Sequence, residues 1–382
     1  MKQEANKILK IDEFLQDRVV VDKIDKNISN NESKFIISVL SEITFFKATL
    51  NKVEISCTLS LVDSNLEYDS YSFENSGIQY ILKLTEDDED NILKREYDNL
   101  SLIKDLNVSA KPLHFETLDF DRKIDVLITT FEHALCFKDL SKSDLNFNIR
   151  TVANTLSFIH ENTVTEELDE TQSFKEEFFA LTDYEYNLPE DRYKGLLRSQ
   201  DFVDHLPVLE ALKSAINEEL MTLPKTQACL NHTNLHKSRI MYRDKLVKFL
   251  NFQYAKKIDC LWDVSISVFY LGLTENPKLE KDFVTQYLKT HDKLNISELE
   301  FLEKLETYKR TAYKLILIKL LCGYFYEVII FGTDRPSKFV DTITIYESLR
   351  QNLILDEENS GFGLVGVPVR EKVDNIFNMY FK

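Results

Sequence analysis

The residues best suited to chemistry lie in one short segment, NHTNLHKSRIM, at positions 231–241. It places His232 and His236 four residues apart, with Asn234 between them, and Arg239 follows. Side chains of these types can hold phosphate oxygens, but the segment contains no carboxylate that could act as a base or bind a metal. A zinc site built on the two histidines would need a third ligand, and none of a suitable type is nearby in the sequence. The segment therefore has the composition of a phosphate-binding loop that lacks catalytic acids.

A second feature is a lysine inside a predicted strand. Lys83 lies within IQYILKLT (78–85), where an unpaired charge would be costly. Glu96 follows 13 residues later, on the same stripe of a predicted helix as Leu93 and Leu100. We therefore expect Glu96 to pair with Lys83, against the alternative of an exposed lysine on an edge strand.

The elements that must position these residues fall into a β-rich part and a helical part. From residue 34 to about Phe131, β-branched and aromatic runs predict strands at KFIISVL, KVEISCTLSLV, IQYILKLT, KPLHFETL and KIDVLITTF. A helix is predicted at EDDEDNILKREYDNLSLIKDL, because its acidic start suits a helix N-terminus. From about Asn146 the spacing favours helices, such as IRTVANTLSFIH, with one hairpin formed by RIMY, the turn RDK and LVKFLNF.

These patterns predict an α+β protein with three regions. Residues 1–33 are expected to form a helical extension, and residues 34–131 a β-rich N-terminal lobe. Residues 132–382 are expected to form a helical C-terminal lobe, which carries the histidine-rich loop and the hairpin at 231–253.

The composition favours a large globular protein in a reducing compartment. Hydrophobic residues make up 43% of the 382 residues, and the formal net charge is −17. Nucleic acids need a basic surface, so we expect no nucleic acid partner. An acidic chain suits an unknown protein partner or a small cationic ligand. The five cysteines form no C-x-x-C pair, which favours a cytoplasmic protein without a cysteine metal site.

A membrane partner is not expected either. The longest apolar run, residues 315–332, is interrupted by Lys319 and Glu327. This run therefore predicts a buried helix rather than a membrane span.

The order of these features resembles the aminoglycoside phosphotransferase and choline kinase family, whose fold is protein-kinase-like. The resemblance covers roughly residues 75–350 and implies a two-lobed protein. It also implies that Lys83 contacts nucleotide phosphates while it is paired with Glu96. Three more residues are candidate nucleotide ligands: Thr130, Glu132 and Arg239.

The histidine-rich segment aligns with the family's catalytic loop, H-G-D-x-H-x-x-N. His232 and His236 match its histidines, but Asn234 stands at the position of the catalytic aspartate, which deprotonates the acceptor hydroxyl. Arg239 stands at the position of a metal-binding asparagine, and Asn251, in NFQ, at that of a metal-binding aspartate. An amide cannot accept a proton at neutral pH, and it binds Mg²⁺ more weakly than a carboxylate does.

Two further matches to the family are structural. His160 ends the helix pattern NTLSFIH, and Asp263, in LWDVSISVFYL, stands at the position of the aspartate that supports the loop. Two roles are open for Arg239: a direct contact with phosphate oxygens, or a salt bridge with Asp244 or Asp259. We expect the salt bridge.

The resemblance and its departures together predict a catalytically impaired, kinase-like binding or regulatory protein, that is, a pseudokinase. ATP or another nucleotide is its expected ligand, and Mg²⁺ is not expected. Two alternatives are open. One is an active ATP-dependent small-molecule phosphotransferase that uses Asp259 or Asp263, and the other is a structural, partner-binding protein with no nucleotide.

Overall fold

The computed structural model divides by its contacts into two units. The first comprises Met1–Ser141 with Ser238–Ala255, and the second comprises Lys142–Lys237 with Lys256–Lys382. The hairpin that was expected within the helical part therefore belongs to the first unit, while the domain boundaries at residues 33 and 131 stay predictions. The structure describes residues 19–24, 28–43, 55–64, 68–75, 78–86, 91–131, 134–166, 216, 218–220, 222–235, 237–274, 276–294 and 296–312.

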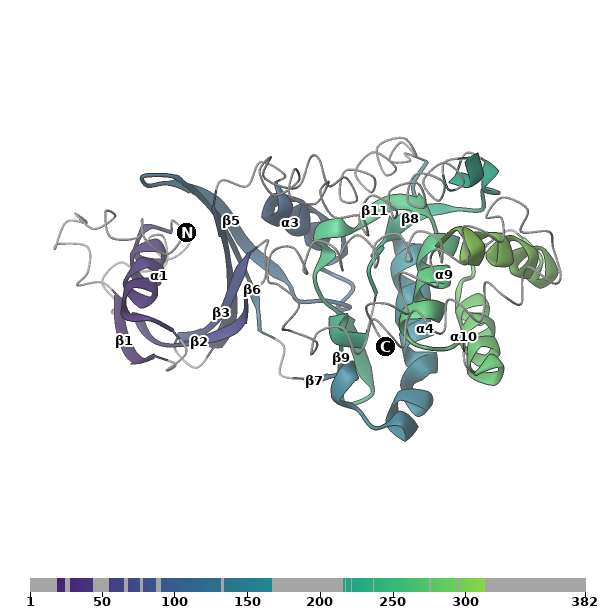
Figure 1. Ribbon diagram of the computed structural model, residues 1–382, viewed down its shortest axis with the longest axis horizontal. Helices are drawn as coiled ribbons and strands as arrows, with labels where there is room; N and C mark the ends of the chain where they lie inside the picture. Colours follow the sequence, from purple (N-terminus) through teal and green to yellow (C-terminus); the bar gives the residue numbers. More distant parts are fainter. Residues whose placement is uncertain are drawn as a thin grey trace, which may run out of the picture. The chain divides into compact units, whose positions relative to one another are not determined.

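A six-stranded sheet forms the centre of the first unit, with the strand order β1-β2-β3-β4-β6-β5 (Figure 1). Neighbouring strands are antiparallel except for β1 and β2, which are parallel and are linked through helix α1. The strands are β1 (Val19–Ile24), β2 (Ile55–Ser64), β3 (Asp69–Asn75), β4 (Ile78–Glu86), β5 (Pro112–Asp119) and β6 (Lys123–Thr130). The helices of this unit are α1 (Asn30–Glu42) and α3 (Ile92–Ile103).

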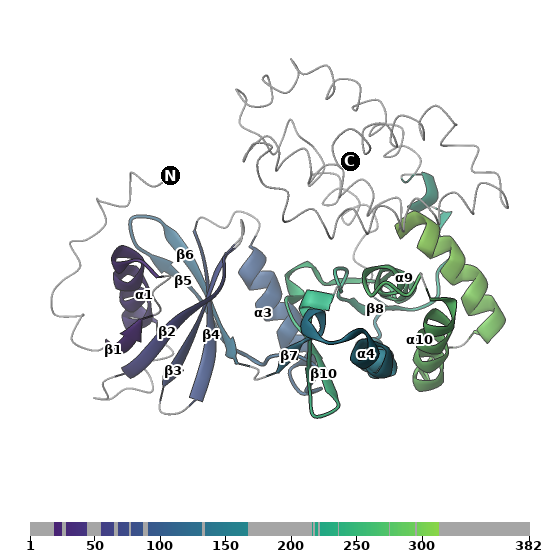
Figure 2. The ribbon, with the colours of Figure 1, turned by 60° about the horizontal axis from the view of Figure 1, so that its bottom comes forward.

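The sheet lies between α1 and α3 (Figure 2). Lys83 of β4 is opposite Leu127 of β6, and cross-strand partners share a face of the sheet. Leu127 packs with Leu93 of α3, whereas Leu82 and Leu84 pack in the cluster that includes α1. Successive residues of a strand point to opposite faces. Lys83 is thus directed to the α3 side, where Glu96 lies.

The prediction of a strand at KFIISVL was wrong, because residues 34–40 belong to helix α1. The helix begins with a capping box: the Ser29 hydroxyl accepts from the Glu32 N–H, and the Glu32 carboxylate accepts from the Ser29 N–H. Ile36 and Leu40 are buried at helical spacing. The β-branched residues favoured a strand, but the cap and the packing against the sheet decide for a helix. β1 likewise lies where a helix was expected, and it is held by its pairing with the distant strand β2.

The predicted hairpin is present as β9 (Ile240–Arg243) and β10 (Leu246–Phe249). Its two-residue turn, Asp244 and Lys245, has positive φ angles of 52° and 68° at these positions, as a tight hairpin turn requires. β9 also pairs with the short strand β7 (Leu135–Cys136). The hairpin is followed by a 3₁₀ turn, η5 (Phe252–Tyr254). Two more 3₁₀ turns are η3 (Phe137–Asp139) and η4 (Lys237–Arg239).

Helices dominate the described part of the second unit. α10 packs on α4, and α9 is buried along nearly its whole length, from Leu261 to Phe269. No described helix is both long and apolar enough to span a membrane, and the apolar run at 315–332 lies outside the described residues. The elements are α4 (Lys142–Asn162), β8 (Ala228–Asn231), β11 (Lys256–Asp259), α9 (Leu261–Tyr270), α10 (Pro277–Thr290) and a helix over residues 298–312.

The packing of α1 against the sheet predicts a specific loss of stability. Ile36 has no exposed surface, so Ile36→Ala should lower the free energy of unfolding by about 2–5 kcal/mol, because it leaves a cavity in the core. The exposed neighbour Lys34→Ala should change it by less than about 0.5 kcal/mol. Urea unfolding of both variants checks this, and equal effects would contradict the helical packing.

Candidate functional site

The expected ion pair between Lys83 and Glu96 is present. The Lys83 Nζ lies 2.8 Å from Oε1 and 2.7 Å from Oε2 of Glu96. The two side chains are almost fully buried, with exposed fractions of 7% and 2%. The ring of Tyr68 lies 4.6 Å from the same ammonium group, which adds a cation–π contact.

Asn251 completes the contacts of the lysine. Its Oδ1 accepts a hydrogen bond from Lys83 Nζ at 3.1 Å. Asn251 has a left-handed backbone, with φ at 63°, which asparagine tolerates better than most residues. The turn that follows is fastened to α3, because the side chain of Asn99 donates to the carbonyl oxygens of Phe252 at 2.9 Å and Ala255 at 3.2 Å. Asn251 is therefore held in a fixed position relative to the ion pair.

The charge of Lys83 is stabilised by this arrangement. Burial by itself lowers the pKa of Lys83, but the Glu96 carboxylate more than offsets burial, and the resulting pKa lies above the ordinary value. The Arg239 guanidinium acts in the opposite direction and lowers the pKa of Lys83. Lys83 is thus an ammonium at neutral pH, and Arg239 is close enough for their charges to repel each other.

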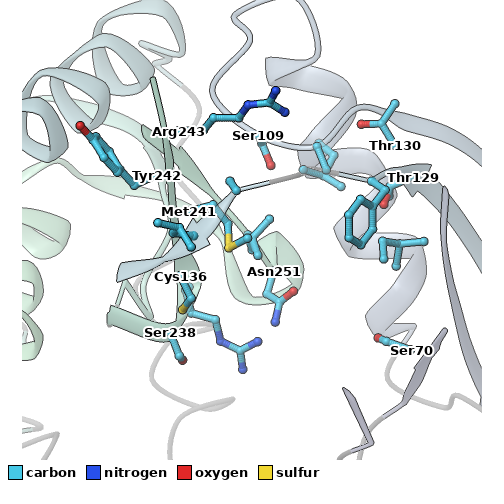
Figure 3. Close-up of a pocket in the computed structure, with 18 of the residues that line it drawn as sticks. Ser70, Ser109, Thr129, Thr130, Cys136, Ser238, Met241, Tyr242, Arg243 and Asn251 are labelled. Carbon is cyan, nitrogen blue, oxygen red and sulfur yellow. The ribbon is translucent and has the colours of Figure 1, made fainter. Parts of the chain in front are cut away.

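A cavity of about 1070 Å³ lies beside the ion pair, and every residue that lines it belongs to the first unit. Figure 3 shows Ser70 and Thr129 from the sheet on one side of this pocket and Cys136 and Met241 from the β7–β9 region on the other. The pocket brings together five residues that the sequence had singled out: Lys83, Glu96, Thr130, Arg239 and Asn251.

The net charge of the pocket wall is opposite in sign to the net charge of the chain. The cationic lining residues are Lys83, Lys138, Arg239 and Arg243. The acidic lining residues are Glu96, Asp139 and Asp244. With four cations against three anions, the pocket wall has a positive balance in a chain whose formal charge is −17. A local field of this sign attracts anions.

Of the two salt bridges considered for Arg239, the one with Asp244, which lies in the same unit, is not formed. Asp244 pairs instead with Arg243, at 3.3 Å, because the two are neighbours at the hairpin turn. Asp259 accepts hydrogen bonds from Thr226. The Arg239 Nε is buried and has no hydrogen-bond partner within the described part of the chain. The alternative role for Arg239, a contact with phosphate oxygens, therefore stays open.

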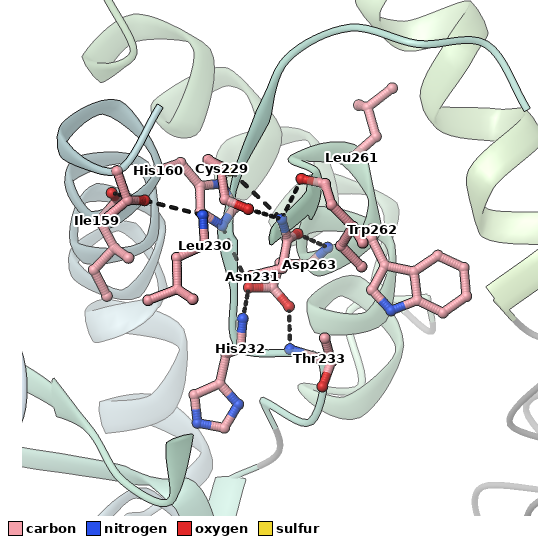
Figure 4. A network of polar contacts seen from close by, with 12 residues as sticks. Ile159, His160, Cys229, Leu230, Asn231, His232, Thr233, Leu261, Trp262 and Asp263 are labelled. Carbon is pink, nitrogen blue, oxygen red and sulfur yellow. Dashed lines mark hydrogen bonds and ion pairs between the residues drawn. The ribbon is translucent and has the colours of Figure 1, made fainter. Parts of the chain in front are cut away.

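In the second unit, Asp263 holds the start of the histidine-rich loop (Figure 4). Its carboxylate accepts from the backbone N–H of His232 and, at 2.7 Å, from that of Thr233. It also contacts His160 Nε2 at 3.3 Å, and its own N–H donates to Asn231 Oδ1 at 3.0 Å. Thr233 adopts a positive φ of 62°, a conformation that glycine adopts at lower cost. The network fixes the backbone of the loop.

Of the remaining site residues predicted from the sequence, the structure describes some and not others. Asn234 is partly buried, and its backbone N–H donates to His232 Nδ1 at 3.3 Å. His236 and Glu132 lie outside the described residues. Because the loop to residue 237 belongs to the second unit, its residues are not part of the pocket wall described above.

The two carboxylates considered as substitute catalysts are occupied by structural contacts. Asp259 accepts from the Thr226 N–H and hydroxyl, the latter at 2.6 Å, and from the Leu261 N–H at 3.0 Å. Burial raises the pKa of Asp259, and these hydrogen bonds act against that rise. Asp263 uses both of its oxygens to hold the loop and His160.

Sequence inspection missed several pocket residues. Tyr68 precedes β3 and comes to Lys83 only because Ser70 is opposite Lys83 in the sheet. Ser109 enters the wall because its hydroxyl donates to the Phe249 carbonyl at 2.6 Å, across 140 positions of the chain. Contacts at this range leave no local pattern in the sequence.

The fold of this chain is similar to solved structures, whereas its sequence matches no protein-family model and no curated protein. Many solved structures are similar in fold, among them the following three. An amicoumacin kinase in complex with AMP-PNP, Ca²⁺ and Ami matches 78% of this chain and 95% of its own, at 15% identity and a TM-score of 0.53. A choline kinase from Streptococcus pneumoniae matches 81% and 98%, at 14% identity and 0.52. An ethanolamine kinase from Plasmodium vivax matches 86% and 90%, at 16% identity and 0.53.

At these identities the similarity establishes the fold. The chain has a two-lobed α+β, protein-kinase-like fold, as expected from the order of its motifs.

The ion pair predicts an asymmetry between single and double substitutions. Lys83→Ala should lower the free energy of unfolding by about 3–5 kcal/mol, because Glu96 would be left as a buried, unpaired charge. The double variant Lys83→Met with Glu96→Leu should be close to the unmodified protein in stability, because it removes both charges and keeps the volume. Chemical denaturation measures both. A double variant as unstable as the single one would show that the loss comes from packing.

The buried side chain of His291 gives a prediction about how stability depends on pH. His160 Nδ1 lies 2.7 Å from the Tyr287 hydroxyl, and the rings of Tyr287 and His291 lie 5.5 Å apart. Neither ring nitrogen of His291 has a hydrogen-bond partner among the described residues, and burial lowers its pKa from 6.5 to about 4.

Between pH 6.5 and 4 the unfolded chain therefore binds a proton at His291 that the folded chain does not bind. The contribution of His291 to the free energy of unfolding is fully present above pH 6.5. It is lost as the pH is lowered, with a slope of up to about 1.4 kcal/mol per pH unit. His291→Phe should show a shallower decline in unfolding free energy, measured by urea titrations from pH 7 to pH 4.5. Parallel curves for the two proteins would exclude His291 as the source.

Proposed function

We propose that this protein is a pseudokinase: a kinase-like protein that binds a nucleotide in the pocket beside Lys83 and does not transfer phosphate. The protein-kinase-like fold supports the location of the site. The buried pair of Lys83 and Glu96 places a fixed ammonium group at the pocket wall, and its positive charge contributes to a field that favours phosphate groups. Nucleotide binding is a property of the kinase-like neighbour solved with AMP-PNP, and for this chain it is part of the proposal.

The observation that carries the proposal is the contact between Asn251 and Lys83. Phosphoryl transfer depends on a divalent cation that bridges the phosphates and neutralises their charge. Asn251 stands where the family resemblance places a metal-binding carboxylate, but it is an amide, and its oxygen accepts from the Lys83 ammonium at 3.1 Å. Among the described residues, no three His, Cys, Asp or Glu side chains gather to form a metal site. The residues present do not fit Mg²⁺.

The base is missing as well. Asn234 stands at the position of the catalytic aspartate, and an amide cannot take a proton from an acceptor hydroxyl at neutral pH. Loss of a general base costs roughly 10²–10⁴ in rate. The structural contacts of Asp259 and Asp263 argue against either of them as a replacement.

The pocket suits a nucleotide in size and in character. Its volume of about 1070 Å³ is slightly above the typical range of ligand sites, which is about 300–1,000 Å³. Ile81, Ala110, Met241 and Leu250 give its wall an apolar part suited to a base, while the cationic residues suit phosphates. The positive balance of the wall favours an anionic ligand over the small cationic ligand considered from the composition.

The proposal predicts binding without turnover. In calorimetric titrations the protein should bind ATP or ADP. In assays with labelled ATP it should transfer no phosphate to choline, ethanolamine or aminoglycosides, with or without Mg²⁺. The matched control is the double variant Lys83→Met with Glu96→Leu, which should fold and fail to bind ATP.

Two results would overturn this proposal. Transfer of phosphate by the unmodified protein that is lost in the double variant would establish the active phosphotransferase. In that case Asp139 and Asp244, the exposed carboxylates of the pocket wall, are the first residues to replace. Absence of binding to any nucleotide would establish the structural, partner-binding alternative.

A further inference from the structure

Arg239 and Asn251 share the pocket wall with Lys83 and lie close together in the backbone. The carbonyl oxygen of Arg239 accepts from the N–H of Leu250 at 2.9 Å, so the residue before Asn251 is tied to Arg239. Both residues belong to the first unit, with Arg239 directly before β9 and Asn251 shortly after β10. Arg239 therefore presents its guanidinium to the pocket from a fixed backbone.

The guanidinium has capacity for a ligand. Its Nε is buried without a hydrogen-bond partner among the described residues, which normally carries a cost in free energy. The two carboxylates that could have paired with it, Asp244 and Asp259, are engaged elsewhere. An orphaned donor on a cationic side chain at the wall of a cavity is the expected state of a residue whose partner is an anionic ligand.

The charges at these two positions supply the independent argument. In the pattern of the resembling family, position 251 carries a carboxylate and position 239 a neutral asparagine. Relative to that pattern, this chain has one negative charge fewer at Asn251 and one positive charge more at Arg239. The cluster around Lys83 is thereby more positive by two charges, which is the charge of one divalent cation.

We propose that the pocket binds the phosphate groups of a nucleotide without a divalent cation, with the Arg239 guanidinium in the role that Mg²⁺ has in phosphotransferases. This inference rests on the proposed function and specifies the ionic form of its ligand. A guanidinium can hold two phosphate oxygens at once through parallel N–H groups. Lys83 contributes the second fixed positive charge. Because Mg²⁺ competes for the same phosphate oxygens, the metal-free nucleotide is the preferred ligand.

The first part of the experiment compares metal conditions with the unmodified full chain. ATP, ADP and adenosine are titrated calorimetrically in EDTA and again in excess Mg²⁺. The proposal predicts that ATP and ADP bind in EDTA more tightly than adenosine does, and that Mg²⁺ leaves their affinity unchanged or lowers it. ATP binding that is tenfold or more tighter in Mg²⁺ would overturn this inference and leave nucleotide binding intact. No binding in either buffer would overturn the proposed function as well.

The second part isolates Arg239. Arg239→Gln should weaken ATP binding in EDTA by about 10- to 100-fold, the usual effect of a lost charge-assisted hydrogen bond, and should leave adenosine binding unchanged. Arg122→Gln is the matched control, because Arg122 pairs with Glu86 at the surface and does not line the pocket. ATP affinity that is unchanged in Arg239→Gln would overturn the assignment. If this variant does not fold, Arg239→Lys, which keeps the charge and loses the paired geometry, should bind ATP with intermediate affinity.

A third variant reverses the charge change. Arg239→Asn combined with Asn251→Asp restores one carboxylate and removes one cation, so its affinity for ATP should rise when Mg²⁺ is added. Circular dichroism confirms that the variants are folded before they are titrated. A double variant that binds ATP equally well in EDTA and in Mg²⁺ would show that these two positions do not determine the metal dependence.

Discussion

The buried ion pair of Lys83 and Glu96 constrains the rest of the pocket. Transfer of two charged groups from water into the protein interior costs free energy. The pair is therefore stable only if the ammonium and the carboxylate have their hydrogen bonds satisfied. The ammonium of Lys83 has three donors, and the structure supplies three acceptors: both carboxylate oxygens of Glu96 and the Oδ1 of Asn251. The turn at Asn251 must therefore be held at a fixed distance from α3, and Asn99 holds it. Sheet, helix and hairpin are arranged around one cation.

The histidine-rich loop is held by contacts that do not depend on catalysis. Asp263 accepts from the N–H groups of His232 and Thr233 and contacts His160. These contacts satisfy buried polar groups, so their value for stability does not depend on catalysis. Among the described residues, the side chain of Asn234, which aligns with the catalytic aspartate of the family pattern, makes no such contact. In the structure, Asn234 contributes its backbone N–H to the loop, and an amide side chain there disturbs none of these contacts. Under the proposed function, selection for folding alone would keep the contacts of Asp263 and would not require an aspartate at position 234.

The features that the sequence predicted well have local signals. A charge in an apolar strand and a glutamate on the inner stripe of the next helix were enough to pair Lys83 with Glu96. The turn RDK was enough to locate the hairpin. For α1, the capping box of Ser29 and Glu32 is also a local signal, but the strand prediction for KFIISVL rested on its β-branched residues alone. The sequence therefore contained a signal for this helix that the strand prediction did not use.

Other features depend on contacts between distant segments, which no local pattern records. The parallel pairing of β1 with β2, the position of Tyr68 over Lys83, and the entry of Ser109 into the pocket wall are of this kind. The Arg239 Nε, which has no hydrogen-bond partner among the described residues, is another. From the sequence, Asp244 was a reasonable partner, but the tight turn places Asp244 beside Arg243 instead. Which cation a carboxylate selects is decided by turn geometry, and only the folded chain gives that geometry.

The proposed binding mode and the proposed lack of transfer have the same cause. A divalent cation does two things for a bound nucleotide: it balances the charge of the phosphates, and it stabilises the further charge that develops during transfer. A guanidinium fixed in the wall can do the first, because it needs only to meet oxygens already in place. Arg239 alone cannot stabilise the charge that develops during transfer. Asn251 offers no carboxylate to hold a metal, and its oxygen already accepts a hydrogen bond from Lys83. The exchange of a mobile cation for a fixed one thus favours retention of the ligand over its reaction.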